Sequence, residues 1–526
     1  MTMTELSRRD WLKYAGLSAA GCALSSSRPT AAELNGVIDI GSRRELMVDD
    51  YLVDRLDGNI RHRMHSPTPR EEVIRFDKPW EGNSSFCNEV FRIDGKYQMF
   101  YRGWAYRYGE NLAQAHSAMC CYAESSDGIH WERPSLGLTP FAGSRDNNIV
   151  EFPGQIGDYN TVPSTFTVTI DDNPDCPVDA RYKGLVLVLE PRGLVPLQSA
   201  DGLRWQAITE EPVITGDAFD SQNRLFWDTV RGEYRVYYRY VTSGESGNGG
   251  TRGIKTAVSP DLISWTEGER LNYQDSRVMQ MYDNGVFPYY RAPHLFVGFP
   301  QRYLDRGWSE SMRALPDREH REMRSKMMER LGTALTDTLL MTSRDGLAFH
   351  RFGEAFIRPG VERPGTWNYS HTYVACPPVE TVSALPGAPD ELSLYVTEDY
   401  WTGDPGSAVR RYTLRVDGFV SVHADGSGGE FVTRPLRFSG DRLSLNFSTS
   451  AAGSIRVEIQ HQDGRPIEGY ALEDCPDIFG DSLERTVSWK SGSDLTRLAG
   501  ETIRLRFTMQ DADLYALQFR QETATQ

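Results

Sequence analysis

The stretch SDGIHW at residues 126–131 recurs in altered form along the middle of this 526-residue chain. The further copies are SADGLRW at 199–205, SPDLISW at 259–265, SRDGLAF at 343–349 and a weaker RVDGF at 415–419. Successive aspartates of the repeat are 74, 60, 84 and 72 residues apart. Similar segments at such long intervals indicate an architecture built from repeated units.

Four of the five copies contain Asp-Gly, the chemistry of a tight turn, and all five end in an aromatic residue. Glycine accepts a positive φ and aspartate bonds to its own backbone, so Asp-Gly between apolar runs favours a hairpin. Alternating strands precede two of these turns, GKYQMFYR at 95–102 and GEYRVYYR at 232–239. Five units of four strands predict an all-β chain containing a five-bladed β-propeller. The repeated aspartates then mark turns; the alternative is that they bind a ligand.

The repeat stops after DGSGG at residues 425–429, and short alternating strands such as IRVEI at 455–459 follow. Such strands predict a compact antiparallel β-sandwich. We therefore expect three segments, which are an export signal at residues 1–32, the five-bladed β-propeller at 33–429 and the β-sandwich at 430–522.

One charged stretch interrupts the fourth unit. Residues 316–330 begin with a proline and place Met323 and Met327 at helical spacing. The pattern predicts a surface helix, either a solvated cover or a lid over the substrate.

The N-terminus has the features of a twin-arginine export signal. SRRDWLK at residues 7–13 places paired arginines ahead of an apolar and small-residue stretch at 14–24. That stretch is too short to cross a bilayer, and no later run is apolar enough to do so. We expect a periplasmic or extracellular protein, with lipid attachment at Cys22 as the alternative.

Composition and missing motifs narrow the function. The net charge is −16, whereas binding to nucleic acid needs Lys and Arg to neutralise phosphates. The motifs HExxH, GxSxG and GxxxxGK[ST] are absent from the sequence, so zinc protease, serine hydrolase and nucleotide-binding classes lack their signatures. The expected partner is a carbohydrate, with no nucleic acid and no membrane-spanning segment.

Residues just before each inner strand of a propeller should meet at one end of the ring. Paired carboxylates supply acid and base across a glycosidic bond, amides bind hydroxyls, and indole rings stack on sugars. The sequence predicts catalytic carboxylates at Glu81, Asp158, Asp220 and Asp283. It predicts substrate-binding side chains at Trp80, Asn88, Gln222, Asn223, Arg224, Arg291, His294 and His371.

Structural roles compete with these assignments. Turn capping is the alternative for Asp158 and Asp283. Arg291 and His294 suit a carboxylate, sulfate or phosphate substituent, but Arg291 equally suits a packed structural role. No cofactor and no metal-binding residue is predicted, and an axial calcium ion is left open.

Four segments taken together support a family assignment. They are ELMVDDYL at 45–52, FDSQN at 219–223, RAPH at 291–294 and DGFVS at 417–421. The chain resembles exported bacterial proteins related to invertase- and arabinanase-type propeller glycoside hydrolases. The resemblance covers nearly the whole mature chain and implies the fold more firmly than the reaction.

That wider group implies carboxylates at the starts of the inner strands, commonly Asp, Asp and Glu in the first three blades. This chain departs from the pattern, because it offers Glu81 in the first blade and Asp220 in the third. The opening typical of invertases is also absent, so individual roles do not transfer.

The leading hypothesis is an exported glycoside hydrolase that acts on an extracellular poly- or oligosaccharide. A glycoside phosphorylase and a non-catalytic glycan-binding propeller are the alternatives. The sugar, the linkage, the stereochemical outcome and the oligomeric state are left open by the sequence.

Overall fold

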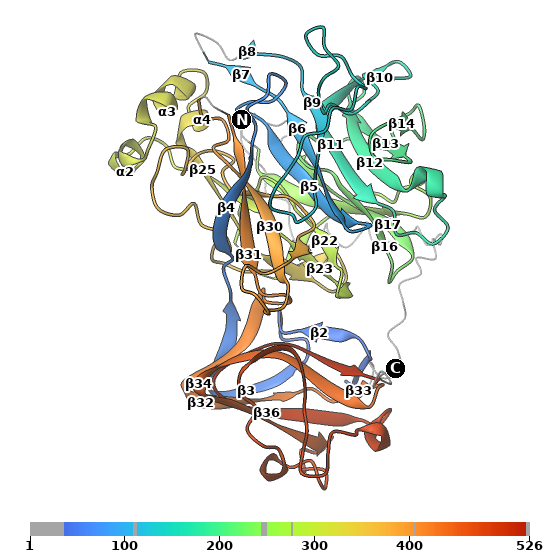
Figure 1. Cartoon of the computed structure of the whole chain (residues 1–526), viewed down its shortest axis with the longest axis vertical. Coiled ribbons are helices and arrows are strands. Elements are labelled where there is room, and N and C mark those ends of the chain that lie inside the picture. Colours follow the sequence, from blue (N-terminus) through green and yellow to red (C-terminus); the bar gives the residue numbers. More distant parts are fainter. Residues whose placement is uncertain (1–35, 109–112, 243–249, 275–276, 404–405, 522–526) are drawn as a thin grey trace, which may run out of the picture.

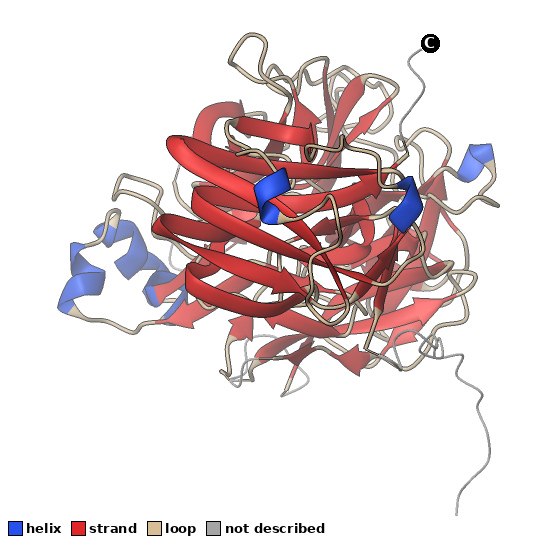
Figure 2. Ribbon diagram, turned by 90° about the horizontal axis from the view of Figure 1, so that it is seen from below, coloured by secondary structure: helices blue, strands red, loops and turns tan. Residues whose placement is uncertain are grey.

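The computed structural model describes residues 36–108, 113–242, 250–274, 277–403 and 406–521. Strands dominate the described chain, and helices are few and short, so the all-β prediction is confirmed (Figures 1 and 2). The proposed export signal, including Cys22, lies outside the described residues. Within those residues, no helix is both long and apolar enough to cross a membrane.

Five main sheets follow one another along residues 86–414. The first contains β5 (Phe86–Ile93), β6 (Lys96–Gly103) and β9 (Met119–Ser125). The second contains β10 (Gln155–Ile156), β11 (Tyr159–Ile170), β12 (Tyr182–Val188), β13 (Gly193–Ser199), β14 (Gln206–Ala207) and β15 (Ile214–Thr215). The third contains β16 (Arg224–Asp228), β17 (Glu233–Val241), β18 (Arg252–Ser259) and β19 (Glu269–Arg270).

The last two sheets have additions. The fourth contains β20 (Asn272–Tyr273), β22 (Phe287–Tyr289), β23 (Ala292–Gly298), β26 (Met341–Ser343) and β27 (Ala348–Arg351). Beside it lies a three-stranded sheet of β21 (Gln280–Met281), β24 (Gln301–Asp305) and β25 (Ala334–Thr338). The fifth contains β28 (Tyr373–Val374), β29 (Val379–Thr381), β30 (Glu391–Glu398), β31 (Ala408–Leu414) and, from the N-terminal side, β4 (Thr68–Arg75). A separate hairpin joins β7 (Tyr106–Arg107) to β8 (Ala113–Gln114).

The five sheets pack face to face in a closed order. Their middle strands are buried on both faces, as in β12, where all seven residues are buried. Each interface is one apolar cluster shared by two neighbouring sheets. One pair of residues represents each interface. The pairs are Phe100 and Val186 (first and second sheets), Leu187 and Val236 (second and third), Tyr237 and Phe296 (third and fourth), Val297 and Val396 (fourth and fifth), and Tyr395 and Met99 (fifth and first).

The repeated turns have one geometry in four copies. In each, the aspartate accepts hydrogen bonds from the backbone N–H groups two and three residues later, and a serine two residues earlier bonds to the aspartate. The glycine position has a positive φ even in the third copy, where it is Leu262. Asp417 of the weak fifth copy is instead fully buried and ion-paired with Arg44 and Arg291.

An eight-stranded sheet forms the other part of the molecule, below the five sheets in Figure 1. It contains β1 (Ile38–Gly41), β2 (Arg44–Leu46), β3 (Val53–Met64), β32 (Val420–Thr433), β33 (Leu436–Phe438), β34 (Arg442–His461), β35 (Asp481–Thr486) and β36 (Ile503–Arg520). The sequence-based boundary at 429/430 therefore falls inside β32, and residues 38–64 belong to this sheet rather than to the repeat region. The physical reason is that β3 pairs with β32, a contact between strands more than 350 residues apart.

Helices are confined to short insertions. Three lie between β24 and β25, namely α2 (Glu310–Ala314), α3 (Arg318–Ser325) and α4 (Arg330–Thr333). The expected helix at 316–330 thus appears as α3 and the start of α4. The described residues also contain three single helical turns, η2 (Val178–Ala180), η3 (Leu472–Asp474) and η4 (Thr496–Leu498).

Candidate functional site

We call β5, β11, β16, β22 and β28 the inner strands of the five sheets, and we call the end of the ring at which they start the entrance. Hydrogen bonds between neighbouring sheets tie these starts together. They run from Asn88 Nδ2 to the Phe166 carbonyl, from Thr167 Oγ1 to the Asn223 carbonyl, from Asn284 Nδ2 to the Gln222 carbonyl, and from the Cys376 N–H to the Asn88 carbonyl. Residues that are far apart in sequence therefore meet here, as expected for the predicted site.

One buried arginine at the entrance, Arg239, lies close to two carboxylates. Arg239 Nη1 donates to Asp220 Oδ1 at 3.1 Å, and its other Nη donates to the Tyr282 carbonyl. Asp283 follows Tyr282 directly and accepts hydrogen bonds from Ser221 Oγ at 3.2 Å and from the Asn284 N–H at 2.8 Å. Asp220 and Asp283 are thus brought together, as the sequence predicted.

The two carboxyls have different environments. The Asp220 side chain is 27% exposed, whereas Asp283 is buried. Burial raises the pKa of Asp283 to about 6, against the opposing influence of Arg239. Two acids whose surroundings differ in this way suit separate acid and base roles.

A second ion pair lies deeper, between the first and third sheets. Arg224 Nη1 donates to Glu89 Oε1 at 2.7 Å, and Nη2 donates to the Cys376 carbonyl at 2.6 Å. Burial raises the pKa of Glu89, and Arg224 opposes this shift. Arg224 therefore links three sheets across the ring, and its first role is structural.

Amide side chains beside this pair have polar atoms that form no hydrogen bond within the described chain. Among the described residues, Asn88 Oδ1, Asn223 Oδ1 and both polar atoms of the Gln222 side chain are buried without a hydrogen-bond partner. Buried polar groups of native proteins are nearly always paired, so these atoms mark a place for water or a ligand. All three residues were predicted to bind substrate.

Aromatic side chains surround the acids. Five of them form what we call the tyrosine cluster, with ring centroids of neighbouring pairs 5.4 to 6.5 Å apart; its members are Tyr282, Tyr303, Tyr369, Tyr373 and Tyr400. Half-buried rings lie next to it, with the centroids of Trp104 and Tyr106 4.7 Å apart and those of Tyr106 and Trp401 5.3 Å apart, both pairs tilted. Trp104 Nε1 and Tyr108 Oη have no partner among the described residues. These rings offer both a stacking face and free donors to a sugar.

The backbone around the entrance is strained. Left-handed φ angles occur at five residues other than glycine in the segments that border it, namely Phe219, Trp367, Ser370, Thr372 and Trp401. Each such residue costs on the order of 1–3 kcal/mol, and residues of this kind gather at functional sites. The strain supports placing the site at this end of the ring.

Trp80 and Glu81 lie away from this group of acids. Glu81 is buried, accepts hydrogen bonds from Tyr101 Oη and the Lys78 N–H, and pairs with Arg133 at 2.9 Å. Trp80 donates to Asn148 Oδ1 at 2.8 Å. Both side chains are therefore occupied by packing within the first sheet, in contrast to the predicted catalytic and binding roles.

Two more predicted residues lie outside the acid group. Asp158 is exposed in the turn between β10 and β11, several residues before the part of β11 that reaches the entrance. His371 is fully buried, and burial lowers its pKa to about 4, although Glu398 opposes this shift. Thr336 Oγ1 donates a hydrogen bond to the His371 carbonyl, and this bond helps to hold the strained 367–372 segment in place.

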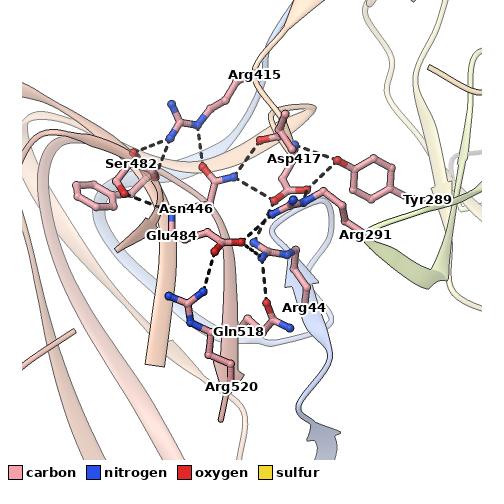
Figure 3. Close-up of polar contacts among 12 residues, drawn as sticks. Arg44, Tyr289, Arg291, Arg415, Asp417, Asn446, Ser482, Glu484, Gln518 and Arg520 are labelled. Carbon is pink, nitrogen blue, oxygen red and sulfur yellow. Dashed lines mark hydrogen bonds and ion pairs between the residues drawn. The ribbon is translucent and has the colours of Figure 1, made fainter. Parts of the chain in front are cut away.

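Arg291, shown in Figure 3, and His294 lie where the ring meets the eight-stranded sheet. Arg291 Nε pairs with Asp417 at 3.0 Å and Arg291 Nη2 with Glu484 at 3.2 Å, beside Arg44 from β2. His294 Nε2 lies 3.4 Å from Glu45. Their position at this contact corrects the expectation that they bind substrate, and of the two roles weighed for Arg291 it fits the structural one.

Sequence reasoning missed Arg102, Arg239 and Glu89. Arg102 and Arg239 end the two matching strands FYR and YYR of the repeat, so their equivalent positions were a usable signal. Glu89 lies one residue after the predicted Asn88. Within the described chain, no group of three His, Cys, Asp or Glu side chains is arranged to hold a metal ion.

A cavity of about 800 Å³ lies at the opposite end of the ring, where the inner strands end. Its walls include Trp227, Tyr290 and Pro377. The acids of the entrance do not line it.

Comparisons with known proteins add limited information. No family model matches the chain, and no curated protein matches it. Similar solved structures include a glycosyl hydrolase from Bacteroides ovatus, with 16% identity, a TM-score of 0.37, and coverage of 71% of this chain and 93% of that one. A putative glycoside hydrolase from Parabacteroides distasonis has 15% identity, a TM-score of 0.37 and coverage of 68% and 97%. A thermostable family-43 glycoside hydrolase has 13% identity, a TM-score of 0.36 and coverage of 64% and 91%.

Proposed function

We propose that the chain is a glycoside hydrolase whose active site lies at the entrance. The five sheets are then the blades of a β-propeller, and the eight-stranded sheet is the accompanying β-sandwich. The single observation on which the function rests is that Asp220 and Asp283 lie close to the same buried arginine, Arg239, where Asp220 is partly exposed and Asp283 is buried with a raised pKa.

The roles follow from the two environments. Asp283, with a pKa of about 6, retains a proton in weakly acidic solution and donates it to the leaving glycosidic oxygen. Asp220, ion-paired with Arg239 and open to solvent, is the carboxylate that activates water or attacks the anomeric carbon. Arg239 holds Asp220 by an ion pair and lies close enough to Asp283 to oppose the rise of its pKa, so it acts as a positioning residue.

The surrounding side chains fit a sugar. The rings of Trp104, Tyr106 and Trp401 provide a stacking surface, and Trp104 Nε1 is available to donate to a hydroxyl group. The side-chain amides of Gln222 and Asn223 have polar atoms without a hydrogen-bond partner among the described residues, so they are available to bind a ligand. We further propose export through the twin-arginine pathway, on the basis of residues 7–13.

The test is release of reducing ends from a panel of neutral and acidic polysaccharides by the wild type and by Asp220→Asn. We expect activity on at least one member and a loss of at least about 100-fold in the variant, the size typical of removing a catalytic acid or base. Asp179→Asn, an exposed aspartate on η2, is the matched control and should retain full activity.

Other results would overturn the proposal. Activity that persists in both Asp220→Asn and Asp283→Asn would exclude this carboxylate pair. Product formation that requires inorganic phosphate would identify a phosphorylase, and glycan binding without turnover would identify a binding protein.

A further inference from the structure

Three arginines converge on the tyrosine cluster from two sheets. Arg102 on β6, Arg239 on β17 and Arg252 on β18 are 8%, 3% and 5% exposed. Their guanidinium groups lie over aromatic rings, Arg102 over Phe86 at 4.1 Å, Arg239 over Tyr282 at 4.1 Å, and Arg252 over Tyr303 at 4.6 Å. We call these three residues the arginine group.

The arginine group has few carboxylate partners. Among the described residues, Arg102 donates to the carbonyls of Ser84 and Ser164 and to Tyr400 Oη, and Arg252 donates to Gln280 Oε1. Of the three, Arg239 alone has an ion pair with a carboxylate in the described chain, that of Asp220. The Nε groups of Arg239 and Arg252 are buried without a partner there.

A fourth arginine reinforces the pattern. Arg324 of α3 is fully buried and donates to Asn368 Oδ1 at 2.8 Å and to the Trp401 carbonyl at 3.1 Å. No carboxylate of the described residues forms an ion pair with it. Among the described residues, these four buried guanidinium groups thus share a single ion pair with a carboxylate, that of Arg239 with Asp220, in a chain whose net charge is −16.

This local excess of positive charge is costly unless a ligand compensates it. A buried ion without a counter-charge loses hydration, and cation–π contacts restore only about 1–2 kcal/mol of that loss. Charge in a low-dielectric wall also acts over several ångströms, so it favours an anion in the adjoining site. The overall acidity of the protein disfavours anions everywhere else.

We propose that the substrate bound at the entrance is an acidic glycan, with a sugar carboxylate placed within the field of the arginine group. The inference rests on the proposed function for the location of the site and adds the chemical class of the substrate. Guanidinium groups match carboxylate geometry and remain charged, which is why arginine is used for such recognition. Because Asp220 and Asp283 already supply both carboxyls needed with water as nucleophile, the anion is assigned to the substrate and not to an attacking phosphate.

The experiment compares binding of acidic oligosaccharides with that of the same compounds after reduction of their carboxylates to alcohols. Oligogalacturonides, alginate oligomers and glucuronic-acid-substituted xylan oligomers are titrated calorimetrically into wild type and Arg252→Gln. We expect at least one acidic member to bind about tenfold or more tightly than its reduced counterpart, as charge-assisted bonds provide. Arg252→Gln should lose most of that preference, and Arg252→Lys should retain part of it.

Arg181→Gln is the matched control, because Arg181 lies by the cavity at the opposite end of the ring. It should keep the wild-type preference, and thermal unfolding should show that Arg252→Gln is folded. Equal or tighter binding of the reduced compounds, equal weakening of both forms by Arg252→Gln, or no binding of any acidic member would overturn the inference. Preferential binding without release of reducing ends would support this inference while refuting the proposed hydrolysis.

Discussion

Two buried acids of this chain, Glu81 and Asp283, illustrate how partners decide the role of a carboxyl. Glu81 pairs with Arg133 and also receives hydrogen bonds from Tyr101 and the Lys78 N–H, so its charge is compensated within the first sheet. Asp283 receives one hydroxyl and one backbone N–H. Burial raises the pKa of both carboxyls, and what distinguishes them is that the ion pair with Arg133 fits Glu81 to a structural role.

Glu81→Gln is expected to destabilise the protein and not to remove the chemistry selectively. Loss of the buried carboxylate leaves Arg133 without its main counter-charge, which costs about 3 kcal/mol. Denaturant unfolding measures this, and exposed Glu132→Gln should change the free energy of unfolding by less than about 0.5 kcal/mol. A large fall in activity of Glu81→Gln with unchanged stability would return Glu81 to the list of catalytic candidates.

Asp283→Asn is expected to stabilise the protein at neutral pH. The folded-state pKa of about 6 lies above the value of about 3.9 in the unfolded chain, so the folded state binds more protons between these values. Wild-type stability should therefore fall as pH rises from about 4 to about 6, by up to roughly 3 kcal/mol, and then remain level. Urea unfolding should show Asp283→Asn more stable than wild type at pH 7.5 and similar near pH 4. An identical difference at both values would mean that Asp283 does not titrate in this range.

At the scale of elements, the glycine position of a repeated turn is where the turn packs against the neighbouring sheet. A Cβ added at Gly202 would lie 2.9 Å from Phe100 Cζ of the neighbouring sheet, and φ there is +74°. The turn therefore requires glycine both for its backbone conformation and for the close approach of the first sheet. Leu262 shows that a side chain is accepted where the neighbouring sheet leaves space, since it packs into the cluster between the second and third sheets.

Gly202→Ala should lower the free energy of unfolding by about 2–3 kcal/mol, because backbone strain and the steric clash add. Gly216→Ala is the matched control, since it also has a positive φ, +88°, but nothing lies within 4 Å of its added Cβ. That control should lose only about 1 kcal/mol. Equal losses in the two variants, measured by chemical denaturation, would show that the inter-sheet contact contributes nothing.

At the scale of the whole molecule, a buried ion network joins the ring to the eight-stranded sheet. Asp417, which is fully buried, accepts hydrogen bonds from Arg44, Arg291 and Asn446, and Tyr289 Oη donates to it at 2.8 Å (Figure 3). These partners come from β2, the fourth sheet and β34. The network therefore fixes the two parts of the chain relative to each other.

Asp417→Asn should destabilise the molecule by about 3–5 kcal/mol, since it leaves two arginines without this counter-charge. Asp481→Asn, which breaks the exposed pair with Arg415, should cost less than about 1 kcal/mol. Thermal unfolding measures both, and activity below the melting temperature should be retained in each, because neither residue lies at the entrance. Loss of glycan cleavage in a folded Asp417→Asn protein would contradict the separation of this contact from the site.

Local sequence determined the all-β class and the repeated turns, and it predicted part of the candidate site. An Asp-Gly turn and an alternating strand depend on neighbours a few residues away, so residues 126–131 and their copies were sufficient to predict them. The placement of Asp220, Asp283, Gln222 and Asn223 before inner strands followed from the same periodicity.

Tertiary structure alone decided the rest. Several decisive contacts join residues that are distant in sequence. They are the pairing of β3 with β32, the ion pairs of Glu81 with Arg133 and of Arg291 with Asp417, and the convergence of Arg102, Arg239 and Arg252. Whether a buried charge serves folding or chemistry depends on which partner reaches it. Which partner reaches a buried charge depends on how whole sheets pack, and a local pattern in the sequence does not predict that packing.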